Sequence, residues 1–544
     1  MTKYRADVNP GQPGSASGVV PRARGPGHQA QPGPDLRTLD GMASRAAAGI
    51  AAAAVALGVT QLLAAPLGSG ADARTAVGST IIDLTPGALK EWAIQTFGTH
   101  DKLFLTITVL AVILLVAAIA ARWETRRRPV GSAVLALAGA AGALAVLSRP
   151  GGGVVDILPV LVGAGCGIAV LRLLTSRRSP AATTGPGRRD ALLTLGLAGA
   201  GAVAGLAGSA WGRRWHSVAP DRQAFTAPPV QVPAPPIPAQ VQPAGVDLPS
   251  FVTSNDEFYR IDTALSVPQL ARQDWRLRVH GMVDREITFD MAALAALPVV
   301  EKVVTLTCVS NPVGGDLISN ATWAGYRVRD ILAGVGVHPD ADMVLSKSID
   351  GFTAGTPVEA LTDGRDALLA ITMNGQPLPA EHGYPARLVV PGLYGYVSAT
   401  KWVVDLELTR FDRAQGYWTG LGWSARGPIK TESRIDVPRD GDEIDRGPVT
   451  FGGVAWAQNR GVRNVEVRID SPAGSGVWQP TDLGASYTGD TWRLWRFPWR
   501  ATESGLHTIT VRATDNTGTV QTEDTAPPPP DGATGWHQIE FSVR

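Results

Sequence analysis

The chain has 544 residues, with 49 Lys and Arg against 48 Asp and Glu, and it contains two cysteines. The length predicts several domains, and the balanced charge gives no reason to expect a nucleic-acid partner. Cys166 and Cys308 lie in different halves of the sequence, which argues against a disulfide framework and excludes a zinc site of the paired-cysteine type. The sequence has no CxxCH motif, and therefore no covalent c-type haem is expected.

The N-terminal part of the chain predicts a tail followed by a membrane domain. Residues 1–40 are rich in Pro, Gly, Arg and Gln without periodicity, and we expect them to form a disordered cytoplasmic tail. Residues 41–212 contain five apolar, nearly uncharged stretches. Each is close to the ~20 residues that a helix needs to cross the hydrocarbon core of a bilayer. The prediction is five transmembrane helices, at residues 44–66, 102–121, 130–147, 154–174 and 191–210.

Basic residues in the loops predict the orientation of these helices. Arginines are concentrated before the first apolar stretch, after the second, and between the fourth and fifth. By the positive-inside rule the N-terminus is cytoplasmic, and everything after the fifth stretch is extracytoplasmic in a multi-pass protein of the cell membrane. Arg188 and Arg189 also resemble a twin-arginine export signal, although an ordinary cytoplasmic flank has the same composition. The sequence leaves open whether the fifth stretch is cleaved or retained.

The second half of the chain predicts a linker and two soluble domains. Residues 213–247 are Pro-rich and predict an extended, semi-rigid linker. Residues 248–412 mix short strands and helices and predict an α+β domain, with strands at 275–279, 303–307 and 387–390 and helices at 289–297 and 328–335. Residues 425–544 predict an immunoglobulin-like β-sandwich, because apolar and polar residues alternate at 465–469, 509–513 and 539–543 between Gly- and Pro-rich turns.

Cys308 is the first candidate functional residue. It follows the apolar, β-branched run 303–307 and precedes a loop rich in Asn, Pro and Gly. A lone cysteine is more often a buried apolar filler than a functional group. Its position at the end of a strand favours function, because loops at such positions expose side chains and backbone N–H groups.

The residues around Cys308 form part of a longer ordered pattern. Residues 305–311 read Thr-Leu-Thr-Cys-Val-Ser-Asn, and further motifs flank them. These are Phe258-Tyr259-Arg260, Trp323-Ala324-Gly325, MNGQPLP at 373–379 leading into HGYPAR at 382–387, and Lys401-Trp402. Together they resemble the molybdopterin domain of the sulfite oxidase family over roughly residues 248–412. The C-terminal sandwich resembles the dimerisation domain of that family.

The resemblance implies a bacterial membrane-anchored, molybdenum-dependent oxidoreductase. Its cofactor would be molybdenum–molybdopterin, and no haem is expected. Cys308 would be the protein ligand of the metal, since a soft thiolate suits it, and Arg260 would be catalytic, placing a positive charge beside the reacting group. The cofactor would be bound by Tyr259, Arg260, Asn311, Asp350, His382, Arg387, Ser398, Thr400 and Lys401. Taken singly, such residues are more often salt-bridge partners or turn residues, so it is their joint order that favours a cofactor site.

Several positions depart from the family pattern. Pro312-Val313, Ile371 and Pro529 stand where the sulfite enzymes have arginine, tyrosine and arginine. A sulfite pocket needs positive charge to hold a small dianion. We therefore expect oxygen-atom transfer with a substrate other than sulfite, a sulfoxide or another small oxyanion of lower charge.

Two other functions stay open at this point. One is a reductase of protein or small-molecule sulfoxides. The other, from a different class, is a non-catalytic cell-surface binding module, against which the joint presence of Cys308, Arg260, His382, Arg387 and Lys401 speaks. The redox partner would be a cytochrome or a quinol. The membrane bundle is interpreted as an anchor because its apolar stretches contain few histidines, and residues 425–544 could form a homodimer.

Overall fold

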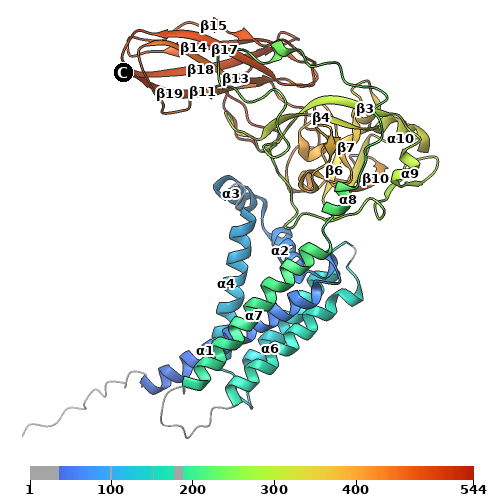
Figure 1. Ribbon diagram of the computed structural model, residues 1–544, viewed down its shortest axis with the longest axis vertical. Coiled ribbons are helices and arrows are strands. Elements are labelled where there is room, and N and C mark those ends of the chain that lie inside the picture. Colours follow the sequence, from blue (N-terminus) through green and yellow to red (C-terminus); the bar gives the residue numbers. More distant parts are fainter. Residues whose placement is uncertain (1–35, 98–100, 151, 177–187) are drawn as a thin grey trace, which may run out of the picture.

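The computed structural model describes residues 36–97, 101–150, 152–176 and 188–544. Figure 1 shows an elongated molecule with a helical bundle at one end and two β-rich domains at the other. The predicted tail lies outside the described residues, except that the first helix, α1, already begins at Leu36.

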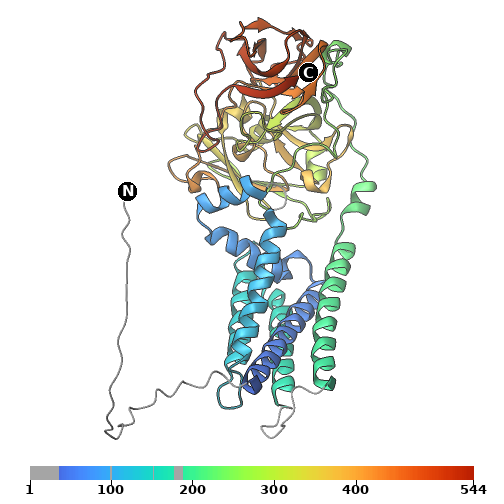
Figure 2. The same cartoon turned by 90° about the vertical axis from the view of Figure 1, so that its left-hand side faces the viewer.

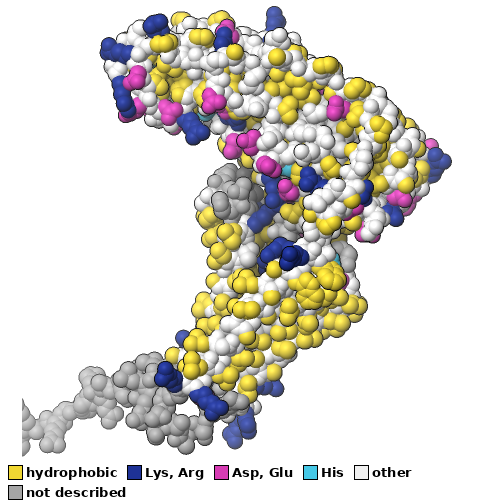
Figure 3. Space-filling model, viewed as in Figure 1, with side chains coloured by type: hydrophobic (Ala, Val, Ile, Leu, Met, Phe, Trp, Pro, Cys, Tyr) yellow, Lys and Arg dark blue, Asp and Glu magenta, His cyan; other side chains and the backbone are white. Residues whose placement is uncertain are grey.

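Five long helices form the bundle, and each is long and apolar enough to cross a membrane. Their apolar spans agree with the five predicted stretches, with candidate spans at Met42–Ala64, Lys102–Ala121, Val130–Leu147, Val154–Ser176 and Arg188–Gln223. The surface of the bundle is correspondingly hydrophobic (Figure 3). The helices are α1 (Leu36–Ala64), α4 (Asp101–Ala121), α5 (Val130–Leu147), α6 (Leu158–Ser176) and α7 (Arg188–Trp215).

Small residues let the bundle helices approach closely. Gly58 of α1 lies against the backbone of Gly201 of α7, so that a side chain at either position would overlap the other helix. Such small-residue contacts are typical of helix pairs in membranes, where dispersion and close backbone packing replace the hydrophobic effect. Two helices that the sequence did not predict, α2 (Ala73–Leu84) and α3 (Gly87–Phe97), lie between α1 and α4 on the side of the soluble domains (Figure 1).

The Pro-rich segment is extended but packed against the soluble domains. After the short helix α8 (Ala219–Gln223), Val232 pairs with Val300, and Val241 is 4% exposed in the core. Gly245 then reaches the side chain of Arg496 in the C-terminal domain. Figure 2 shows this segment rising along the side of the molecule from the end of α7. It therefore packs against both soluble domains along its length.

The middle domain contains two five-stranded sheets. One has the order β2-β1-β10-β5-β6, and the other has the order β3-β4-β7-β8 with β9 paired to β7. The first comprises β1 (Leu277–Gly281), β2 (Ile287–Phe289), β5 (Met343–Ser348), β6 (Thr353–Pro357) and β10 (Val403–Thr409). The second comprises β3 (Val299–Thr307), β4 (Ile318–Arg327), β7 (Leu368–Met373), β8 (Gln376–Pro377) and β9 (Arg387–Val389).

Three short helices accompany these sheets. The helix predicted at 328–335 is confirmed as α10 (Val328–Val335), whose apolar face is buried. The helix predicted at 289–297 is shorter than expected, because α9 covers only Met291–Leu294, capped by Asp290. Helix α11 covers Val358–Thr362. The three predicted strands of this domain are confirmed as β1, β3 and β9.

The C-terminal domain packs two sheets face to face. Alternate residues of both sheets, such as Phe451, Val465 and Phe541, form a common core, as expected for a sandwich. One sheet contains β11 (Glu432–Val437), β13 (Gly447–Trp456), β17 (Arg493–Ala501) and β16 (Asp482–Leu483). The other contains β12 (Glu443–Ile444), β19 (His537–Val543), β18 (Gly505–Asp515), β14 (Val462–Asp470) and β15 (Gln479–Pro480).

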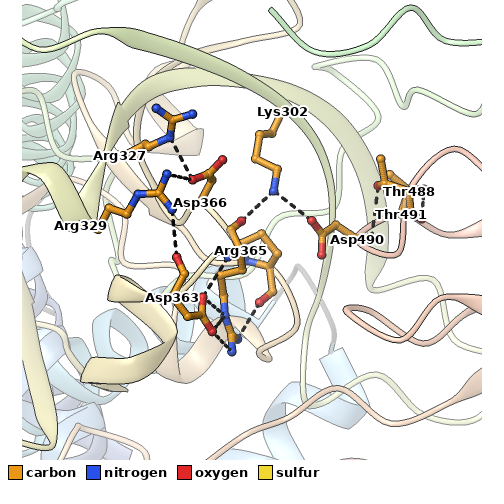
Figure 4. Close-up of polar contacts among 10 residues, drawn as sticks. Lys302, Arg327, Arg329, Asp363, Arg365, Asp366, Thr488, Asp490 and Thr491 are labelled. Atoms are coloured by element: carbon orange, nitrogen blue, oxygen red, sulfur yellow. Dashed lines mark hydrogen bonds and ion pairs between the residues drawn. The ribbon is translucent and has the colours of Figure 1, made fainter. Parts of the chain in front are cut away.

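A polar network connects the two soluble domains (Figure 4). Lys302 of β3 lies 3.1 Å from Asp490 of the C-terminal domain and donates to the carbonyl of Arg365 at 2.7 Å. Arg365 in turn pairs with Asp363 at 2.8 Å. Because β3 ends at the candidate cysteine, this network helps to fix the strand that carries it.

Candidate active site

A cavity of about 270 Å³ opens beside the end of β3. Seven of the predicted site residues line it: Tyr259, Arg260, Cys308, Asp350, His382, Arg387 and Lys401. We call the group Tyr259, Cys308, His382 and Arg387 the inner end, and the group Lys102, Arg260, Asp262 and Lys401 the mouth. At the inner end His382 and Arg387 are buried. At the mouth the side chains of Asp262 and Lys401 are also buried, whereas those of Arg260 and Lys102 are 41% and 28% exposed.

Backbone hydrogen bonds hold Cys308 at the end of β3. Its N–H donates to the carbonyl of Leu317, and its carbonyl accepts from the N–H of Asn311. The amide oxygen of Asn311 accepts from the N–H of Leu317 at 2.8 Å, which closes the loop. The C-terminal domain adds Arg434, which donates to the carbonyl of Gly315 at 2.7 Å. The thiol is therefore presented by a loop anchored from both domains.

Arg387 gives the inner end its electrostatic character. It is 5% exposed and donates only to carbonyls, those of His382, Leu388 and Ala399, with no carboxylate partner in the described part of the chain. Its guanidinium lies 5.0 Å from the ring centroid of Trp323, and burial lowers its pKa to about 10. A buried charge without a counter-ion is costly, so this position is suited to an anion.

His382 adds a neutral imidazole to the inner end. Burial lowers its pKa to about 3, and the nearby charges of Arg387 and Lys401 act in the same direction. One ring nitrogen lies 3.2 Å from the carbonyl of Asn255. Around neutral pH this side chain is therefore a hydrogen-bonding group and not a charge.

At the mouth, a single carboxylate holds three cations. The side chain of Asp262 is 3% exposed and lies 2.9 Å from Lys401, 3.0 Å from Arg260 and 2.5 Å from Lys102. Although burial opposes ionisation, Lys401 and Lys102 hold the pKa of Asp262 well below its usual range. Burial lowers the pKa of Lys401 to about 8 in spite of the attraction of Asp262.

Three predicted residues do not line the cavity. Asn311 is buried within the cysteine loop, and its amide nitrogen has no hydrogen-bond partner among the described residues. The Ser398 hydroxyl donates to the carbonyl of Tyr394 at 2.9 Å. The Thr400 hydroxyl lies 2.7 Å from that of Ser346. The Ser398 and Thr400 hydroxyls thus already have hydrogen-bond partners within the protein. A role of these three residues in cofactor binding stays a prediction.

Sequence reasoning missed Lys102, Asp262 and the aromatic wall of the cavity, which includes Phe352, Trp418 and Trp423. Asp262 follows Arg260 at a spacing that places both on one side of an extended segment, which was a usable signal. Lys102 offered no such signal, because it lies 160 residues away at the start of the apolar helix α4.

Comparison with known proteins agrees with this geometry. Residues 264–418 match the oxidoreductase molybdopterin binding domain. The uncharacterized oxidoreductase YuiH of Bacillus subtilis is 33% identical over 153 residues, which are 28% of this chain and 74% of that protein. The chain belongs to the sulfite oxidase family of molybdopterin oxidoreductases.

Two further matches cover a longer stretch of the chain. Human mitochondrial sulfite oxidase is 29% identical over 327 residues, 51% of this chain, and the chain spans 58% of that relative. The crystal structure of the sulfane dehydrogenase SoxCD from Paracoccus pantotrophus covers 54% of this chain and 81% of its own at 22% identity, with a TM-score of 0.46. The matches to the molybdopterin binding domain, to YuiH and to human sulfite oxidase confirm the family resemblance and the molybdopterin cofactor predicted from the sequence.

The residues present fit the cofactor of this family. The molybdenum–pterin group carries a phosphate, and the buried cation Arg387 lacks a protein counter-ion in the described part of the chain. Cys308 at the same cavity has the soft sulfur ligand that suits molybdenum.

Proposed function

We propose that the chain is a membrane-anchored, extracytoplasmic oxidoreductase that transfers an oxygen atom at a molybdenum centre bound by Cys308. The observation that carries the proposal is the juxtaposition of the Cys308 thiol with a buried, uncompensated Arg387 at the inner end of one cavity. A non-catalytic binding module would have no reason to keep a buried charge at that cost.

In this proposal, separate side chains of the cavity bind the cofactor and the substrate. Arg387 binds the cofactor phosphate, neutral His382 hydrogen-bonds it, and Lys401 contributes charge beside them. When bound, the cofactor supplies oxygen-atom transfer coupled to two electrons. Arg260, exposed at the mouth, holds the oxygen of the substrate and orients it toward the inner end.

We propose a substrate of lower charge than sulfite, such as a sulfoxide. Four basic and two acidic side chains line the cavity. Negative charge on the bound cofactor would compensate most of that excess and leave little attraction for a dianion. Ile371, at a position where the sulfite enzymes have tyrosine, is 1% exposed in the core and does not line the cavity.

We further propose five membrane spans with a cytoplasmic N-terminus. The distribution of charge supports this orientation. Lys and Arg side chains gather at the end of the bundle far from the soluble domains (Figure 3), as the positive-inside rule expects of a cytoplasmic end. Electrons would be exchanged with a cytochrome or a quinol. The C-terminal sandwich, proposed to be immunoglobulin-like, would mediate homodimerisation.

The experiment combines metal analysis with a substrate screen on the full chain in detergent. We expect about one molybdenum per chain and turnover of dimethyl sulfoxide or methionine sulfoxide with reduced benzyl viologen, above the turnover of sulfite with ferricyanide. The change Cys308→Ser should abolish both activities, while Cys166→Ser, in helix α6, should leave them unchanged. Metal-free protein from its native host, or full activity of Cys308→Ser, would refute the proposal.

A further inference from the structure

The membrane helix α4 contributes directly to the cavity of the catalytic domain. Lys102 is the first residue of its apolar span, and it lines the cavity together with residues of the middle domain. Its ammonium group lies 2.5 Å from Asp262 and 2.7 Å from the carbonyl of Ala264. The side chain is 28% exposed, so it lies at the mouth and not in the depth of the cavity.

Other contacts show that this end of the bundle is fitted to the same face of the catalytic domain. Lys90 of α3 is 7% exposed and donates to the hydroxyl of Tyr417 at 3.0 Å. Tyr417 directly precedes Trp418 of the cavity wall. The side chain of Leu265 packs on Gly78 of α2, where a Cβ atom would lie 2.5 Å from it. Lysine and arginine side chains gather in the recess between the bundle and the soluble domains (Figure 3).

The hydrogen bonds of Asp262 indicate how Lys102 can affect the pairing between Asp262 and Arg260. One carboxylate oxygen is held by Lys102, and the other is shared by Arg260 and Lys401. An arginine prefers to bind both oxygens of a carboxylate through its planar fork. With Lys102 in place, Arg260 contacts only the shared oxygen through its Nε. The terminal nitrogens of Arg260 form no hydrogen bond to Asp262, so the pair is not bidentate.

We propose that Lys102 is a positioning residue for Arg260, so that the membrane domain is a working part of the active site and not only an anchor. This inference rests on the proposed function, in which Arg260 binds the substrate. Loss of Lys102 lets Asp262 pair with Arg260 through both oxygens. Substrate binding weakens, whereas the inner end and its cofactor are unaffected.

The test compares Lys102→Met with the wild type in the full chain. We expect unchanged molybdenum content, a KM about tenfold higher for whichever of dimethyl sulfoxide or sulfite the wild type turns over, and kcat within about twofold, the pattern of a lost binding interaction. Deuterium exchange of residues 258–264 should rise, while that of β4 should not change. The matched control is Lys347→Met, on an exposed position of β5, which should resemble the wild type.

A double-mutant comparison of Lys102 and Asp262 provides the second measurement. The effects of Lys102→Met and Asp262→Asn on KM should be far from additive. Wild-type KM and exchange in a molybdenum-replete Lys102→Met protein would overturn the inference while leaving the proposed function intact. If that variant does not accumulate, Lys102→Gln takes its place. Failure of both, with a normal Lys347→Met, would assign Lys102 to folding and also overturn the inference. An inactive, molybdenum-free wild type would instead refute the proposed function.

Discussion

The two ends of the cavity differ in whether their positive charges have a carboxylate partner. At the inner end, Arg387 is buried and bonded only to carbonyl groups. At the mouth, Lys102, Arg260 and Lys401 share the carboxylate of Asp262. An uncompensated buried charge suits an anion that stays bound, because the site is unfavourable when empty. A compensated network whose most exposed member is Arg260 suits a ligand that enters and leaves, because its charges are already paired without that ligand.

The largest effect that separates the two ends is expected for Arg387→Met. Removing an uncompensated buried cation should raise the thermal stability of the cofactor-free protein. The same change should lower molybdenum content more than about thirtyfold, because a desolvated charge partner of the phosphate is lost. Differential scanning of the cofactor-free protein and metal analysis of the holoprotein measure the two effects. A variant that loses thermal stability but keeps its molybdenum would contradict the conclusion that Arg387 is an uncompensated charge that binds the cofactor.

A smaller effect of opposite sign is expected for Asp262→Asn at the mouth. The change leaves three cations without their shared carboxylate, one of them the nearly buried Lys401, and should destabilise the protein by about 3 kcal/mol. The exposed pair Arg278–Glu286 provides the control, since Glu286→Gln should change the stability far less than Asp262→Asn does. Thermal unfolding in detergent at pH 7 compares the two variants. Equal small shifts would mean that the network at the mouth contributes no more than a surface ion pair.

The smallest effect is a pH dependence of cofactor binding through Lys401. Its pKa in the cofactor-free protein is lowered to about 8 by burial. Below that pH the ammonium form is present and attracts the phosphate; above it the charge is lost. Affinity for the cofactor should therefore fall by at most about tenfold for each pH unit above 8. Molybdenum retention after dialysis between pH 6.5 and 9.5 measures the slope, which Lys401→Arg should abolish.

The same lysine changes folding stability in the opposite direction. Its folded-state pKa lies below the ordinary value of 10.5, so the unfolded chain binds more protons between pH 8 and 10.5. The contribution of Lys401 to stability therefore rises with pH across that window. Stability and cofactor retention should thus diverge above pH 8 in the wild type, and a parallel fall of both would point to general unfolding.

Local pattern accounts for much of the fold. The amphipathic run at 328–335 became helix α10 without change, and the five apolar stretches became the five long helices. Helices α2 and α3 were not predicted, because they are too short and too mixed to show an apolar run of membrane length. Their position depends on contacts with the soluble domain, such as that between Lys90 and Tyr417, which no local window contains.

The sequence by itself determined the family, the cofactor and the cysteine loop, because ordered motifs around Cys308 are local and chemically demanding. Only the tertiary structure decided which of the predicted polar residues share one cavity, and that Ser398 and Thr400 bond to protein groups instead. It alone brought Lys102 beside Asp262, across 160 residues. The reason is physical: a charge pair is fixed by distance in the folded chain, and nothing in either local segment specifies its partner.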